Sequence, residues 1–88
     1  MIQKTIYEIN NEMERQDEKW GQQEHSDEYW LAILGEEFGE VSKAIVEGKA
    51  QEIKKELLHV SAVAIQWLDC IARNAAEESE GKCQVKPS

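Results

Sequence analysis

The sequence predicts an all-α fold in which three main helices, over about residues 2–18, 27–47 and 50–78, form a helical bundle. Apolar residues recur at intervals of three and four along these segments, which is the spacing of one helix face. Glycines at positions 21 and 48 separate the segments, and the single proline lies near the C-terminal end. A length of 88 residues corresponds to one small domain, which we assign to residues 1–78, with a disordered tail over 79–88.

The first helix is predicted from a single apolar stripe. Ile2, Ile6, Ile9 and Met13 follow one another at spacings of four, three and four, and polar residues occupy the other positions. One stripe is sufficient for packing against one neighbouring helix. The alternative is that this amphipathic helix binds a partner protein.

The second helix is predicted between a capping serine and a terminating glycine. Residues 19–26 form a loop broken by Gly21, and Ser26 is suited to cap the helix that begins at Asp27. Asp27 and Glu28 place negative charge in the first turn, where the helix dipole favours it. Gly48 is a suitable residue to end the helix.

The third helix is apolar on nearly every side between residues 57 and 72. A helix without a polar face must be surrounded, and two companion helices are too few to surround it. The sequence therefore predicts that a homodimer or tetramer completes the bundle. A membrane-inserted hairpin is disfavoured because His59, Ser61, Gln66 and Asp69 interrupt the apolar run.

Acidic residues lie on the otherwise apolar sides of the second and third helices. Glu37 and Glu40 are three residues apart, as are Glu56 and His59, so each pair lies on adjacent turns of one face. Two carboxylates about 5 Å apart repel by roughly 3 kcal/mol at an effective dielectric of about 20. A divalent cation, Mg²⁺ or Mn²⁺, would offset that repulsion. The alternative is that these glutamates form a solvated helix face.

His59 leaves the metal preference open. Imidazole is a poor ligand for Mg²⁺ and a better one for Mn²⁺ and other transition metals. Glu52, Glu56 and His59 fall at positions i, i+4 and i+7, so Glu52 could supply a further carboxylate to the same site. The sequence does not decide whether His59 binds the metal, supports another ligand or impairs activity.

These motifs resemble those of the MazG-type all-α nucleoside triphosphate pyrophosphohydrolase family, in particular its small phage and bacterial members. The resemblance covers about residues 20–69. It rests on Glu36-Glu37-Phe38-Gly39-Glu40, followed after fifteen residues by Glu56-Leu57-Leu58-His59. The upstream segment Lys19-Trp20-Gly21-Gln22-Gln23-Glu24-His25 and the stretch from Trp30 to Glu37 are also similar. The family has Asp at the position of His59.

The resemblance implies hydrolysis of a nucleoside triphosphate to the monophosphate and pyrophosphate. In that reaction Glu37, Glu40 and Glu56 hold one or two divalent ions, with His59 or Glu52 completing the set, and Glu36 or Glu37 orients the attacking water. It also implies that Trp20 and His25 contact the base, although Trp20 could instead be a core anchor. The candidate cations for the phosphates are Lys43, Lys54, Lys55 and Arg73. The favoured alternative is an ion pair for Lys43 and a solvent-facing charge for each of the other three.

Composition excludes several other classes of function. A net charge of −8 argues against binding a nucleic-acid backbone, which requires clustered Lys and Arg. No apolar run reaches membrane-spanning length, and the N-terminus has no signal-peptide pattern. Cys70 and Cys83 are expected to be reduced thiols, which predicts a cytoplasmic protein.

A non-catalytic role is the main alternative to the enzyme. His59 at the usual Asp position favours a catalytically impaired MazG-like dimer that binds a metal or nucleotide, or that binds another protein. Nothing in the sequence resembles a nucleophilic triad or a glycine-rich phosphate loop.

Overall fold

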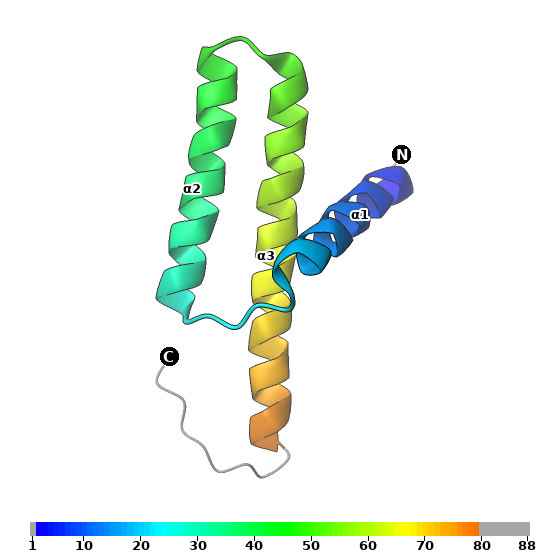
Figure 1. Cartoon of the computed structure of the whole chain (residues 1–88), viewed down its shortest axis with the longest axis vertical. Helices are drawn as coiled ribbons and strands as arrows, with labels where there is room; N and C mark the ends of the chain where they lie inside the picture. Colours follow the sequence, from blue (N-terminus) through cyan, green and yellow to red (C-terminus); the bar gives the residue numbers. More distant parts are fainter. Residues whose placement is uncertain (1, 80–88) are drawn as a thin grey trace.

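A computed structural model of the chain describes residues 2–79, which form three α-helices and contain no strand (Figure 1). The helices are α1 (Ile2–Trp20), α2 (Asp27–Val46) and α3 (Ala50–Ser79). The predicted all-α fold with three helices is therefore confirmed. The predicted disordered tail lies outside the described residues, apart from Ser79, which is the last residue of α3.

Helix α1 ends two residues later than predicted. Lys19 and Trp20, which we expected in the loop, complete its last turn. The backbone N–H of Gly21 still donates to the carbonyl of Asp17, at 2.7 Å, and Gly21 then adopts a positive φ of 75°. A glycine enters this conformation without the steric cost that a side chain imposes, so the helix ends at Gly21 itself.

Helix α2 begins and ends where its capping residues predict. The Ser26 hydroxyl accepts a hydrogen bond from the backbone N–H of Tyr29, at 3.2 Å, as expected of an N-cap. At the other end, Gly48 has φ of 69° and donates to the carbonyl of Ile45, at 3.1 Å. This turn reverses the chain within three residues and makes α2 and α3 antiparallel neighbours.

The three helices are arranged around α3. Helix α2 lies alongside the N-terminal part of α3, and the C-terminal part of α3 extends beyond it (Figure 1). Helix α1 crosses α3 obliquely and, within the described residues, packs against α3 but not against α2. The molecule is accordingly elongated, with extents of 50 × 27 × 23 Å. None of the three helices, over the part of the chain described, is long and apolar enough to cross a membrane.

The core is small and lies between α2 and α3. Its largest member is Trp30, which is 1% exposed and stacks on Trp67 with 6.5 Å between ring centroids. The other buried apolar residues also come from both helices: Val41 and Ala44 on α2, and Ala62, Val63 and Cys70 on α3. Burial of these few side chains is the main favourable contribution that the single chain makes to its own stability.

A second set of apolar side chains forms an exposed surface that we call the outer face. It consists of Leu31, Phe38 and Ile45 on α2 together with Leu57, Leu68 and Ile71 on α3, and each side chain is between 48% and 65% exposed. The radius of gyration is 15.2 Å, above the value of about 12 Å expected for a compact domain of this length. The described chain alone therefore leaves one side of α3 uncovered.

Arg73 ties the loop between α1 and α2 to α3. Its guanidinium donates to Glu24 Oε2 at 2.5 and 2.9 Å, to the carbonyl of Gln23 at 3.1 Å and to Asp69. The contacts with Gln23 and Glu24 join residues about fifty positions apart in the sequence. They hold the loop beside the cavity described below.

Candidate metal and nucleotide site

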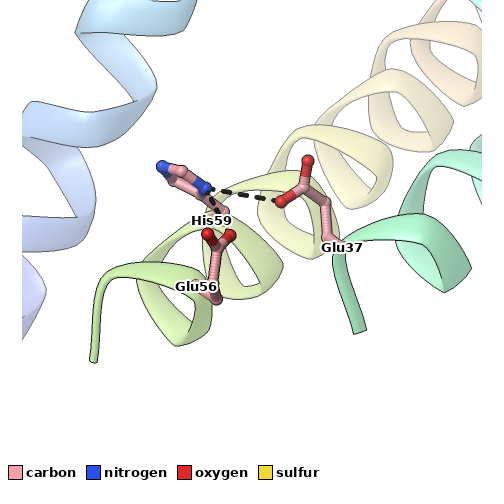
Figure 2. A group of neighbouring side chains, drawn as sticks. All are labelled: Glu37, Glu56 and His59. Carbon is pink, nitrogen blue, oxygen red and sulfur yellow. Dashed lines mark hydrogen bonds and ion pairs between the residues drawn. The ribbon is translucent and has the colours of Figure 1, made fainter. Parts of the chain in front are cut away.

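Side chains from α2 and α3 meet at a cluster of Glu37, Glu56 and His59 (Figure 2). His59 Nδ1 lies 3.0 Å from Glu56 Oε1 and 3.4 Å from Glu37 Oε2. One potential ligand atom from each residue lies within 4.8 Å of the others. All three side chains are partly buried, with exposed fractions of 15–25%. Of the residues predicted to converge between the two helices, the structure thus brings Glu37, Glu56 and His59 together.

Helical spacing explains why these residues meet. Glu37 lies seven residues after Trp30 and seven before Ala44, both of which are buried against α3. Glu56 and His59 lie seven and four residues before Val63, which is buried against α2. Polar residues at these positions necessarily face the neighbouring helix, because the antiparallel turn at Gly48 sets the two helices at matching heights.

Glu12, which the sequence analysis did not identify, brings α1 into the cluster. Its Oε2 lies 3.4 Å from His59 Nε2, so the imidazole contacts carboxylates from all three helices. The hydrogen bond from Arg15 lowers the pKa of Glu12, against the opposing effect of burial. Its position three residues after Ile9, at the edge of the apolar stripe, is the one sequence signal that could have indicated it.

Glu37 is the carboxylate on which burial acts most clearly. Burial raises its pKa, the nearby carboxylates of Glu56 and Glu36 add to the increase, and His59 opposes it. Removal from water disfavours the charged form of a carboxyl group, which explains the direction. An ionised Glu37 therefore costs the folded protein stability unless a positive charge compensates it.

Glu37→Gln is expected to raise the melting temperature at pH 7 by a few degrees. The folded wild type holds the Glu37 proton more tightly than the unfolded chain, so its stability falls as pH rises from 4.5, the ordinary value, through the raised pKa. Glutamine does not titrate, so the difference should disappear near pH 4. Thermal unfolding between pH 4 and 7, with Glu14→Gln at an exposed position inside α1 as the control, measures this. A Glu37→Gln variant less stable than wild type at pH 7 would contradict it.

Glu40 and Glu52, both expected among the metal ligands, lie outside the cluster within the described structure. Together with Glu56 they line a separate shallow cavity of about 130 Å³ between the ends of α2 and α3. Lys43, a candidate phosphate contact, lines the same cavity. Glu56 therefore belongs to the cluster and also lines the shallow cavity.

The other candidate phosphate contacts form ion pairs. Lys54 lies 3.0 Å from Glu8 of α1, and Lys55 lies 3.9 Å from Glu52. Arg73 binds Glu24 and Asp69 as described above. In contrast Arg15, a residue outside the sequence prediction, lines the larger cavity beside the cluster.

This larger cavity, of about 520 Å³, adjoins the cluster on the side opposite the outer face. Glu37 and His59 lie on its wall, together with the exposed Glu36. The rest of the wall is largely aromatic or amide in character: Trp20, His25, Tyr29, Trp30, Gln16, Gln23 and Gln66. The predicted base-contacting residues Trp20 and His25 thus line the same cavity as two members of the cluster.

The aromatic rings of this cavity are arranged by direct contacts. His25 stacks on Tyr29, with 4.3 Å between centroids, and packs edge-on against Trp30 at 5.0 Å. Its Nε2 is 2.8 Å from the side-chain oxygen of Gln23. Trp20 is 65% exposed, with the ammonium of Lys19 5.0 Å from its ring centroid. Trp20 is therefore a wall of the cavity rather than a core anchor.

The donor set of the cluster suits a divalent first-row metal. Two carboxylates and one imidazole offer oxygen and nitrogen ligands in one place. Mg²⁺ strongly prefers oxygen, whereas Mn²⁺ and its neighbours in the row accept this mixture more readily. The residues present fit such an ion.

No protein-family model matches the chain, and neither the curated proteins nor the solved structures include a significant match to it.

Proposed function

We propose that this protein is a metal-dependent nucleoside triphosphate pyrophosphohydrolase that converts an NTP or dNTP and water to the monophosphate and pyrophosphate. The observation that supports the proposal best is the adjacency of two features. A carboxylate–imidazole cluster that fits a divalent ion borders a cavity with aromatic walls. The first feature suits a triphosphate and the second a nucleobase.

The cluster residues have distinct roles in this proposal. Glu37, Glu56 and His59 would hold the divalent ion, with Mn²⁺ preferred to Mg²⁺ because of the imidazole. Such an ion would neutralise charge on the phosphate oxygens and increase the acidity of the attacking water. Glu36 lines the cavity and is exposed. In this proposal Glu36 orients the attacking water and accepts its proton.

The cavity residues bind the rest of the substrate. Trp20 and His25 present ring faces on which a base can stack. Arg15 contributes a guanidinium at the cavity wall, although its hydrogen bond with Glu12 must loosen before it contacts a phosphate. The role in the cell would be the removal of unwanted or surplus nucleotides, and the compartment the cytoplasm.

A non-catalytic module is the second candidate, and His59 is the observation that favours it. Its imidazole already contacts Glu12, Glu37 and Glu56 through hydrogen-bonding distances or ion pairs. A histidine in this position can hold the three carboxylates together through its own contacts, in the place where a metal ion would otherwise bind. The protein would then bind a nucleotide or another protein without hydrolysing it.

Pyrophosphate release from a panel of NTPs and dNTPs separates the two candidates. With purified protein, turnover that requires a divalent metal and is faster with Mn²⁺ than with Mg²⁺ supports the enzyme. Metal- or nucleotide-dependent increases in melting temperature without any turnover support the binding module. No turnover and no shift with any metal or nucleotide contradict both.

We further propose that a second copy of the chain covers the outer face. Each apolar residue there follows by one position a residue that faces the partner helix, as Leu31 follows Trp30 and Leu68 follows Trp67. Because α2 and α3 run antiparallel, the same rotation of about 100° brings both sets to one side of the pair. Tyr29 and Gln66, one position before, line the cavity on the opposite side. Association through the outer face therefore leaves the cavity open.

Phe38→Lys is expected to convert the assembled protein to monomers. Phe38 is 63% exposed at the middle of the outer face, where a buried lysine would lack a partner. Light scattering coupled to size-exclusion chromatography gives the mass, with Ala32→Lys, at an exposed position outside the outer face, as a charge-matched control on the same helix. A wild-type protein that is monomeric at micromolar concentration would contradict the proposal.

A further inference from the structure

Two buried polar atoms beside the cavity lack hydrogen-bond partners within the described residues. One is the indole N–H of Trp30 and the other is the side-chain oxygen of Gln66. Both residues line the aromatic cavity next to the cluster. A buried donor or acceptor without a partner is unfavourable and is uncommon in folded proteins, so each of these atoms needs an explanation.

The surrounding contacts fix which atom of each side chain is available. The amide nitrogen of Gln66 donates to Asp17 of α1, at 3.5 Å, which directs the oxygen of the same amide elsewhere. The indole of Trp30 is 1% exposed and packs against the rings of Trp67 and His25. By contrast the indole N–H of Trp67 is already bonded to Asp27, at 2.9 Å. Within the described chain, the Trp30 indole N–H is thus a free donor and the Gln66 side-chain oxygen a free acceptor, and both residues line the aromatic cavity.

We infer that Trp30 and Gln66 recognise the hydrogen-bonding edge of the base, with the indole N–H donating to an acceptor on that edge and the Gln66 oxygen accepting from the neighbouring donor. The inference rests on the proposed function, because it requires the cavity to hold a nucleobase. The imidazole of His25 lies 5.0 Å from the Trp30 ring and lines the same cavity, so the His25 side chain adjusts as the base reaches the indole N–H. The occupant is therefore a planar ring with an acceptor next to a donor, which describes the pairing edge of a nucleobase.

The test uses nucleosides, which carry no phosphate and so are not substrates for hydrolysis. Calorimetry measures the affinity of the wild type for the four common nucleosides. Each one is compared with a methylated counterpart that lacks the edge donor. These are 3-methyluridine and 1-methylguanosine for the ring N–H, and N6,N6-dimethyladenosine and N4,N4-dimethylcytidine for the exocyclic amine. At least one nucleoside should bind, and its methylated counterpart should bind at least about tenfold more weakly.

Variants of Gln66 and Trp30 test whether these two residues cause the difference in affinity between methylated and unmethylated nucleosides. Gln66→Leu removes the acceptor and should bring the methylated and unmethylated nucleosides to similar affinities, whereas Gln51→Leu on the exposed side of α3 should leave the difference unchanged. Trp30→Phe should weaken every nucleoside by about tenfold while keeping an aromatic ring. Melting temperatures establish that each variant is folded.

Several results would overturn the inference. These are the absence of nucleoside binding, equal wild-type affinities for methylated and unmethylated partners, and unchanged discrimination in Gln66→Leu. The inference would also be overturned by a structure of the unliganded protein in which the Trp30 indole N–H donates directly to the Gln66 side-chain oxygen. A protein that binds nucleosides as described but hydrolyses no triphosphate would end the pyrophosphohydrolase proposal and leave this inference standing.

Discussion

Glu56→Gln should lower metal-dependent pyrophosphate release by about 100-fold or more. Glu56 contacts His59 at 3.0 Å and is one of the three residues whose ligand atoms converge between α2 and α3. Glutamine has nearly the same shape but loses the negative charge and one strong acceptor, so it is a much weaker ligand for a divalent ion. The measurement is initial rate against Mn²⁺ concentration at saturating nucleotide.

Parallel variants decide which carboxylates belong to the site. Glu40→Gln and Glu52→Gln should cause clearly smaller losses, because both residues lie outside the converging group within the described chain. Glu28→Gln, exposed in the first turn of α2, serves as the control and should stay within about threefold of wild type. Equal losses in the Glu40 and Glu56 variants would mean that the metal is bound nearer the shallow cavity.

Trp30→Ala should have the largest effect on stability, a loss of about 3–5 kcal/mol in the free energy of unfolding. Trp30 is 1% exposed and is the largest side chain in a small core. Its removal leaves a void against Trp67 that two helices cannot easily close. Because domains of this size are only marginally stable, the variant should be largely unfolded at 37 °C.

Trp20→Ala is the matched control, since it makes the same change at an exposed position. Its free energy of unfolding should differ from wild type by no more than about 1 kcal/mol. Urea titration followed by circular dichroism gives both values, with a shared slope as the check on two-state unfolding. A comparable loss in both variants would show that Trp20 packs more tightly than its exposure indicates.

Local signals in the sequence were sufficient to predict the helices. The apolar spacing from Ile2 to Met13, the capping role of Ser26 and the terminating role of Gly48 all act within a few residues, and the structure bears them out. The end of α1 was predicted two residues early because the helix continues until Gly21 rather than ending before Lys19. The completion of the bundle by a second chain stays a prediction.

The site was only partly predictable because its members depend on contacts between helices. Glu37, Glu56 and His59 could be grouped, since their spacing placed them on facing sides of two consecutive helices. Glu12 could not be found in this way, because its contact with His59 depends on the angle at which α1 crosses α3. Equally, no local pattern indicates that Lys54 pairs with Glu8 of α1.

A crystal structure of the protein soaked with Mn²⁺, with anomalous data collected, tests the central claim most directly. We predict one strong anomalous peak within bonding distance of Glu37, Glu56 and His59, beside the cavity that Trp20 and His25 line. A structure in which Mn²⁺ is absent from this cluster, or is bound only by exposed carboxylates elsewhere, would contradict the proposal that these side chains form a metal site.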